Sequence, residues 1–152
     1  MYAIGISSLS MAWTLISTAA RLCQSLGYHR IGSAKELDVV DLDTKRAIFG
    51  YVYILDKTLS LRLGRPSSMH EYNLTPEKIL ITTAPGIQPW NLVWCLWIEA
   101  ATIHGWTFEQ LYSPQAIGLS HVERTEAVQR LADATVSAKE KNSKVSILII
   151  KI

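Results

Sequence analysis

The longest amphipathic pattern in the chain runs from Thr44 to Pro66. Its apolar residues recur at spacings of about three and four, so they share one face of an α-helix. That face is Ile48, Val52, Leu55, Leu59 and Leu63, widened by Phe49 and Tyr53. Asp41 or Asp43 is the expected N-cap, because a carboxylate accepts hydrogen bonds from the first free N–H groups. Gly64 and Pro66 predict the end of this helix, since glycine accepts the left-handed conformation and proline lacks the N–H group.

Three more stretches show helical periodicity. The first ends at Gly27, and its predicted apolar face is Ala12, Leu15, Ile16, Ala19, Leu22, Cys23 and Leu26. The second follows Pro89, a residue suited to a first helical turn, and its predicted face is Trp90, Val93 or Trp94, Trp97, Ala101, His104, Phe108 and Leu111. The third begins at a capping box formed by Ser120 and Glu123. Its predicted face is Val122, Thr125, Val128, Leu131, Thr135 and Val136.

Two connections and a tail complete the chain. Residues 31–43 form a polar, acidic linker, and residues 67–89 form a long connection interrupted by prolines. Residues 139–152 start with a charged run and end in a β-branched apolar segment of strand-like composition. The sequence therefore predicts an all-α fold, a helical bundle or array of about four to five helices joined by long loops. Residues 1–138 form the predicted domain, and residues 139–152 form a divergent tail.

The composition is rich in apolar residues, with 49% hydrophobic and 18% charged residues. A typical domain has about 25% charged residues, so this chain has more apolar surface than one small core needs. This composition indicates a fragment of a larger helical domain or a surface for a partner. We also expect sequence upstream of Met1, because the first predicted helix starts abruptly. The net charge is only +2, and no stripe of Lys and Arg could neutralise a row of phosphates. The apolar N-terminus lacks a basic leader and contains several serines and threonines, so a core helix is expected there rather than a signal peptide or membrane anchor.

Asp56 stands out because it interrupts the apolar pattern near the end of its helix, where the helix dipole disfavours a carboxylate. A cationic partner is therefore expected. Arg65 is the preferred one, since a guanidinium can bind a carboxylate through two hydrogen bonds. Such an ion pair would hold the following loop against the helix. Two alternatives to the ion pair remain. Asp56 contacts a ligand or takes part in catalysis, or its carboxylate is simply solvated.

The remaining chemistry is sparse. Cys23 and Cys95 lie on apolar helical stretches, so buried inert thiols are expected, with a disulfide or a reactive thiol as alternatives. No histidine or cysteine spacing indicates a metal site, and no motif for a nucleophile, a phosphate loop or a zinc protease is present. We therefore expect no catalytic, cofactor-binding or metal-binding residues, and no enzymatic activity. The tryptophans Trp90 to Trp97 could line an aromatic cage for a ligand, although core packing is the simpler interpretation.

Three ordered blocks carry a resemblance to a known family. The first is Leu26-Gly27-Tyr28-His29-Arg30, the second is Lys45-Arg46-Ala47-Ile48-Phe49-Gly50, and the third combines Tyr53, Asp56, Lys57, Ser60 and Gly64-Arg65-Pro66. In this order they resemble the fungal-specific transcription factor domain, the middle homology region of fungal zinc-cluster activators, including the xylanolytic-activator regulatory domain. The chain departs from the family pattern at Ala47, where a third Arg is usual, and at Gly50, where Trp is usual.

The resemblance implies a nuclear protein that regulates transcription. It assigns DNA binding and zinc to a six-cysteine module that is absent from this chain, so that this chain reaches DNA only through that module. It also makes Asp56, Ser60, Gly64, Arg65 and Pro66 a family signature with a structural role. Expected partners are other parts of the same protein, other proteins or a second copy as a homodimer, with no membrane. The alternative functions are a helical small-molecule sensor and a protein-interaction or oligomerisation module.

Overall fold

The computed structural model describes residues 8–29, 39–70 and 88–150. All regular elements within these ranges are helical, as expected from the sequence. They are α2 (Leu9–Ser25), α3 (Val39–Leu63), α4 (Gln88–Thr107), the π-helical turn η4 (Phe108–Tyr112), the short α5 (Pro114–Ile117) and α6 (His121–Ile150). Residues 30–38 and 71–87 lie outside the described residues, and with them most of the predicted linker at 31–43 and of the second connection at 67–89. Residues 39–43 of the predicted linker belong to α3.

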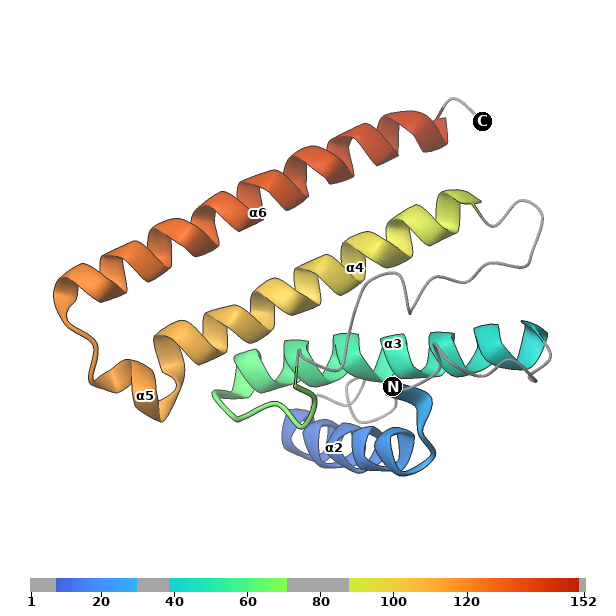
Figure 1. Ribbon diagram of the computed structural model, residues 1–152, viewed down its shortest axis with the longest axis horizontal. Helices are drawn as coiled ribbons and strands as arrows, with labels where there is room; N and C mark the ends of the chain where they lie inside the picture. The colour runs from blue at the N-terminus through green and yellow to red at the C-terminus, as the bar shows by residue number, and fades with distance from the viewer. Residues whose placement is uncertain (1–7, 30–38, 71–87, 151–152) are drawn as a thin grey trace.

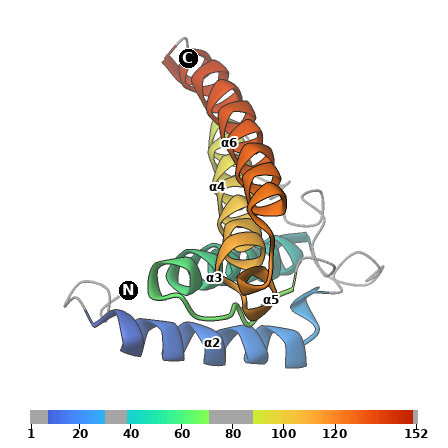
Figure 2. The same cartoon turned by 90° about the vertical axis from the view of Figure 1, so that its left-hand side faces the viewer.

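The helices form an open array in which each one packs on its neighbours. Helix α2 packs on α3, α3 packs on α4, and α4 packs on α6. Figure 1 shows α4 between α3 and α6, with α2 on the other side of α3. Figure 2 shows that α4 and α6 stay together and run across the direction of α2. The array therefore has two outer helices, α2 and α6, and two inner ones.

The core lies where α2, α3 and α4 meet. It consists of Ala20, Cys23, Phe49, Val52, Tyr53, Met69, Ile98 and Ala101, and a smaller cluster joins Ala12 to Leu59. Met69 enters this core from the loop that follows α3. Burial of these side chains stabilises the array by removing apolar surface from water. The loop after α3 is therefore part of the core and not only a connection.

Helix α3 differs from the prediction at its start and at one residue of its buried face, since Val52, Leu59, Phe49 and Tyr53 are buried as expected. It begins at Val39, so Asp41 lies in its first turn, and neither Asp41 nor Asp43 is the N-cap. Asp43 is buried and binds Arg46 one turn later at 3.3 Å. Ile48 is exposed, whereas its neighbour Phe49 is buried. Helices α2 and α4 both cover α3, which agrees with the wide face expected from Phe49 and Tyr53.

The buried face of α2 agrees with the prediction at Ala12 and Cys23, but not at its leucines. Leu15, Leu22 and Leu26 are exposed, while the small side chains of Ala12, Ala20 and Cys23 face α3. Small side chains allow two helices to approach closely, which a row of leucines would prevent. Gly27 has the positive φ value of 73° expected of a residue that ends a helix;.

The remaining helices confirm the predicted starts and part of the predicted faces, since Ala101, Phe108 and Leu131 are buried as expected. Pro89 lies in the first turn of α4, as expected. Ile98, and not Trp97, is the buried residue at that level of α4. In α6 the buried residues are Ala127 and Leu131, whereas the predicted residues Val122, Val128, Thr135 and Val136 are exposed.

The capping box that starts α6 is present. The Ser120 N–H donates to the Glu123 carboxylate at 2.8 Å, and the Glu123 N–H donates to the Ser120 hydroxyl at 3.3 Å. The exposed pair of Glu126 and Arg130 is also found, at 4.0 Å. Helix α6 continues to Ile150, so the strand-like interpretation of the apolar segment is wrong for residues 145–150. A lone segment without a neighbouring strand satisfies its backbone groups best as a helix.

Candidate functional site

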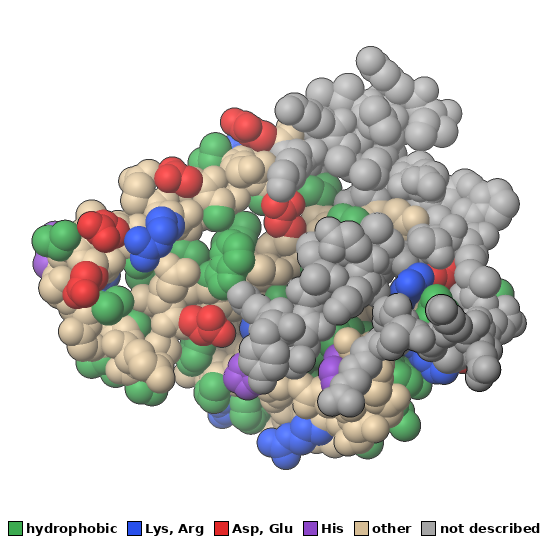
Figure 3. Space-filling model, in the orientation of Figure 1, with side chains coloured by type: hydrophobic (Ala, Val, Ile, Leu, Met, Phe, Trp, Pro, Cys, Tyr) green, Lys and Arg blue, Asp and Glu red, His purple; other side chains and the backbone are tan. Residues whose placement is uncertain are grey.

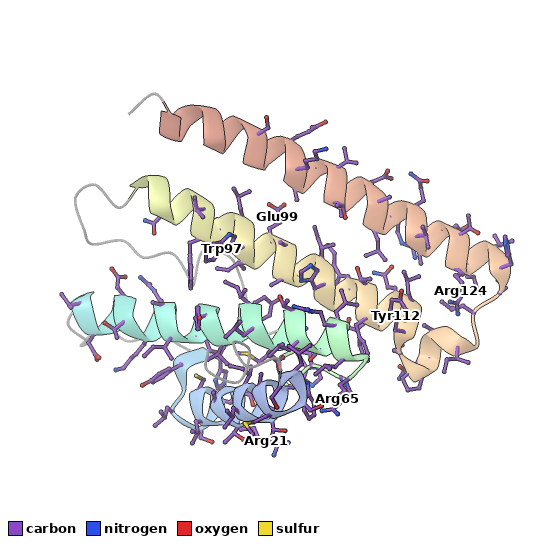
Figure 4. The ribbon with its side chains drawn as sticks, turned by 180° about the vertical axis from the view of Figure 1, so that it is seen from behind. Arg21, Arg65, Trp97, Glu99, Tyr112 and Arg124 are labelled. Atoms are coloured by element: carbon purple, nitrogen blue, oxygen red, sulfur yellow. The ribbon has the colours of Figure 1, made fainter. Side chains whose placement is uncertain are left out.

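The five signature residues lie together at the C-terminal end of α3 and in the loop that follows it. Asp56 and Ser60 occupy successive turns of α3 and are fully buried, at 0% and 1% exposure. Gly64, Arg65 and Pro66 begin the loop, and Figure 4 shows Arg65 at this end of α3, beside α2. The site is therefore a helix–loop junction that is packed between α2 and the core.

The Asp56 carboxylate holds the loop to the helix. It accepts hydrogen bonds from the Ser68 N–H at 3.0 Å and from the Met69 N–H at 3.2 Å. The Ser67 hydroxyl is its third donor. A buried carboxylate with several donors is compensated for its loss of water. The predicted role of Asp56, fastening the loop to the helix, agrees with this geometry, but the predicted partner does not.

Arg65 binds α2 and not Asp56, so the predicted ion pair is wrong. Its guanidinium lies over the Trp13 ring, 4.9 Å from the centroid, and donates to the Ser10 hydroxyl at 3.2 Å. The Trp13 indole N–H in turn donates to the Ser60 hydroxyl at 3.3 Å. The loop amides already occupy Asp56, whereas the planar guanidinium finds an aromatic face on the adjacent helix. Arg65 thus connects the loop to α2.

Gly64 ends α3 by a Schellman motif. Its φ value is 63°. The Gly64 N–H donates to the Leu61 carbonyl at 3.3 Å, and the Arg65 N–H donates to the Ser60 carbonyl at 2.9 Å. These two bonds satisfy helix-end carbonyls, and they require a left-handed residue at this position. The sequence prediction for Gly64 is confirmed.

Replacing Gly64 by alanine is expected to lower the free energy of unfolding by about 1–2 kcal/mol, which is the cost of a left-handed residue with a Cβ atom. No atom would clash, because nothing lies within 4 Å of the added Cβ. Chemical denaturation of both variants measures the loss. Gly118→Ala is the matched control, since Gly118 has a φ value of −82°. Equal stability of Gly64→Ala and the parent chain would contradict the backbone argument.

A cavity of about 510 Å³ opens beside the junction. Its walls come from α3, the loop, η4 and α5, and include Lys57, Ser60, Ser67, His70, Phe108 and Glu109. Lys57 is only 1% exposed, and its ammonium group lies 5.6 Å from the centroid of the Tyr53 ring. Cavities of roughly 300–1,000 Å³ can hold small molecules, and π-helical turns such as η4 often occur at functional sites. The junction is thus one wall of the cavity, and the Lys57 ammonium group is buried behind that wall.

The other sequence candidates do not join this cavity. Neither Cys23 nor Cys95 forms a disulfide, and burial raises the pKa of both thiols, as expected for inert cysteines. His104 is hydrogen-bonded to the Thr58 hydroxyl at 3.3 Å, and burial lowers its pKa. Trp94 packs on the core while Trp97 is 54% exposed, so these two indoles do not share one stripe. Among the described residues, no group of His, Cys, Asp and Glu could hold a metal ion.

Sequence reasoning missed the partners of the signature residues. Trp13 was assigned to no site, and Ser67, Ser68 and Met69 were placed in an unspecific connection. One signal was available. Asp56 is an acidic residue in an otherwise apolar helix, and the loop after that helix contains the short hydroxyl side chains of Ser67 and Ser68. Trp13 had no comparable signal, because its contact with Arg65 joins residues far apart in the chain.

Comparisons with known proteins place these residues in a family context. A family model described as the fungal specific transcription factor domain matches residues 1–80. An ABC-transporter-regulating transcription factor of Aspergillus oryzae is 31% identical over 111 residues, which are 67% of this chain and 12% of that protein. A protein of the same description from Aspergillus fumigatus is 30% identical over 111 residues, and this match again covers 67% of this chain and 12% of that protein. An uncharacterized transcriptional regulatory protein of Schizosaccharomyces pombe is 39% identical over 57 residues, which are 38% of this chain and 7% of that protein.

The matched region is a small part of these relatives, about an eighth of the length of the two Aspergillus proteins. No solved structure matches the chain significantly. The family model covers the whole junction, because residues 1–80 include α2, α3 and the loop after α3.

Proposed function

This chain belongs to the fungal specific transcription factor domain family, and from that membership we propose that it acts as a regulatory part of a larger transcription factor. The observation that supports this most directly is the junction itself. Three signature residues fix the junction: Asp56 binds the loop through the Ser68 N–H, and Ser60 and Arg65 both contact Trp13 of α2. A junction fixed in this way can transmit a change in the cavity to α2.

DNA binding is proposed to reside outside this chain. The net charge is only +2, and Figure 3 shows acidic and basic side chains interspersed on the visible face and not gathered into a basic patch. Phosphate contacts require clustered Lys and Arg. The proposed location of zinc and of the DNA contacts is a six-cysteine module elsewhere in the protein, which also implies a nuclear location. In the described helices, none is long and apolar enough to cross a membrane.

We propose regulation without catalysis, through contacts within the protein or through a small molecule. The cavity beside the junction supports the second route, because the polar side chains of Ser67 and His70 line it together with the apolar ring of Phe108. A small molecule that bound there would touch Ser67, whose hydroxyl binds Asp56. Its binding energy could therefore alter how firmly the loop is held.

A reporter assay tests the regulatory proposal. The chain is fused between an unrelated DNA-binding module and a constitutive activation segment, and transcription of a reporter gene is measured against the same fusion without the chain. We expect the chain to change reporter output by several-fold, because a folded regulatory domain alters access to the activation segment. Asp56→Ala should return the output toward that of the fusion lacking the chain.

The control in this assay is Asp133→Ala, which removes an exposed carboxylate from α6. It should behave like the parent fusion, with equal amounts of each protein confirmed by immunoblotting. If the parent chain left the reporter unchanged, the regulatory proposal would be wrong for this part of the protein.

A further inference from the structure

Two features that weaken a helix meet in the wall of the cavity beside the junction. Gly105 is buried in the interior of α4 and lines the cavity. Glycine at such a position lowers helix stability, because more backbone freedom is lost on folding. The π-helical turn η4 follows and adds Phe108 and Glu109 to the same wall. A side chain at Gly105 would occupy part of the cavity, so the glycine keeps this space open.

The cavity separates two parts of the chain that are distant in sequence. Pro66 and Ser67, in the loop after α3, line one side, and Phe108 and Pro114 line the other. Figure 1 shows this loop and α5 at the same end of the array. A molecule in the cavity would therefore contact both parts at once. The volume of about 510 Å³ lies in the usual range for small-molecule sites.

The interior of the cavity is mainly apolar, and its hydroxyl groups are already engaged. The Phe108 ring is 9% exposed, and two prolines lie in the same lining. The Ser113 hydroxyl donates to the Glu109 carbonyl at 2.6 Å, and the Ser67 hydroxyl binds the Asp56 carboxylate. Few polar groups in the interior are therefore left for a ligand, and a ligand must gain most of its affinity from apolar contact.

The charged side chains of the lining disfavour a charged ligand of either sign. Lys57 is 1% exposed, and its ammonium group lies 5.6 Å from the centroid of the Tyr53 ring. Its positive charge behind the wall opposes the entry of a cation. Glu109 lies exposed on the opposite wall, and its carboxylate repels an anion. A neutral molecule avoids both repulsions and loses less hydration when it is buried.

We propose that this cavity binds an uncharged, mainly apolar molecule that carries a hydroxyl or N–H group at one end. The apolar part lies against Phe108 and the prolines. The polar end lies on the solvent side, where the exposed Glu109 carboxylate and Gln115 amide accept its hydrogen bond. This inference names the ligand class for the small-molecule route of the proposed function and rests on that route.

Equilibrium dialysis of the purified full chain against three probes of similar size tests the charge preference. The probes are naphthol, naphthoate and naphthylmethylamine, which are neutral, anionic and cationic near neutral pH. We expect naphthol to bind with a Kd of roughly 10–500 µM. Each charged probe should bind at least about 10-fold more weakly. Binding of either charged probe as tightly as naphthol would overturn the proposal.

Two variants test whether naphthol binds in this cavity. Gly105→Leu fills the cavity from α4, and Gln115→Trp covers its solvent side from an exposed position on α5. Each should weaken naphthol binding at least about 5-fold. The matched control is Ala138→Leu, which fills a separate hollow of about 430 Å³ between α4 and α6 and should bind naphthol like the parent chain. Circular dichroism checks the helix content, and Gln115→Trp decides alone if Gly105→Leu loses it.

Three results would contradict the location or the site itself. They are no binding of naphthol up to about 1 mM, binding that Gln115→Trp leaves unchanged, and binding that only Ala138→Leu abolishes. The regulatory proposal is judged separately by the reporter assay. A chain that binds no probe and still changes reporter output would regulate through protein contacts. A chain that binds naphthol in the cavity without changing reporter output would keep the site and lose the proposed function.

Discussion

Replacing Phe49 by alanine is expected to lower the free energy of unfolding by about 3–5 kcal/mol, the usual cost of removing a large aromatic ring from a core. Phe49 is 4% exposed and lies in the cluster where α2, α3 and α4 meet. Its removal would leave a cavity between all three helices, which fixed backbones can close only in part. Chemical denaturation followed by circular dichroism measures the loss.

The neighbouring residue provides the control. Ile48 is 43% exposed, so Ile48→Ala should cost about 1 kcal/mol or less. The sequence pattern placed Ile48 on the apolar face and used Phe49 to widen it, so this pair of variants also tests which of the two residues α3 buries. Equal losses for the two variants would show that α3 presents a different face to its neighbours.

Replacing Asp56 by alanine is expected to lower the free energy of unfolding by about 3 kcal/mol. The substitution leaves the N–H groups of Ser68 and Met69 without their acceptor in a buried place, and each unsatisfied group costs about 1–3 kcal/mol. Met69, which is 1% exposed, would also lose the bond that holds its backbone at the core. The loss is measured by chemical denaturation, and proteolysis after Arg65 should become faster.

Two further variants separate this account from an ion pair. Asp56→Asn keeps one carbonyl oxygen as an acceptor, so it should cost about 1–2 kcal/mol. Arg65→Gln should cost about 1 kcal/mol, because it removes a cation–π contact and one hydrogen bond near the surface;. If Arg65→Gln were as damaging as Asp56→Ala, the two residues would act as a pair after all. Asp133→Ala, in the exposed part of α6, should stay within about 0.5 kcal/mol of the parent chain.

The elements and ends that the sequence predicted correctly are those set by local chemistry. Gly27 and Gly64 take the positive φ values that end α2 and α3, and Ser120 and Glu123 form the capping box that starts α6. Each of these features depends on residues within one helical turn of each other. The family resemblance also followed from short blocks in a fixed order, and the match to residues 1–80 confirms it.

The candidate site was predicted in part. The signature residues Asp56, Ser60 and Gly64 were identified together, and fastening of the loop to the helix was the expected role of Asp56. The partner was wrong, because the choice between Arg65 and the loop amides depends on where α2 places Trp13. The aromatic ring that attracts the guanidinium lies more than 50 positions away in the chain.

The sequence by itself determined that this chain is helical, where α2 and α3 end, where α6 begins and to which family it belongs. Only the tertiary structure decided which apolar residues of each predicted face are buried. Periodicity locates an apolar stripe, but the positions of the neighbouring helices decide which of its residues are covered: α2 and α4 bury Phe49 and leave Ile48 exposed. The row formed by Leu15, Leu22 and Leu26 on α2 is the converse case. It is apolar and yet exposed, because the small residues on the other side allow closer packing against α3.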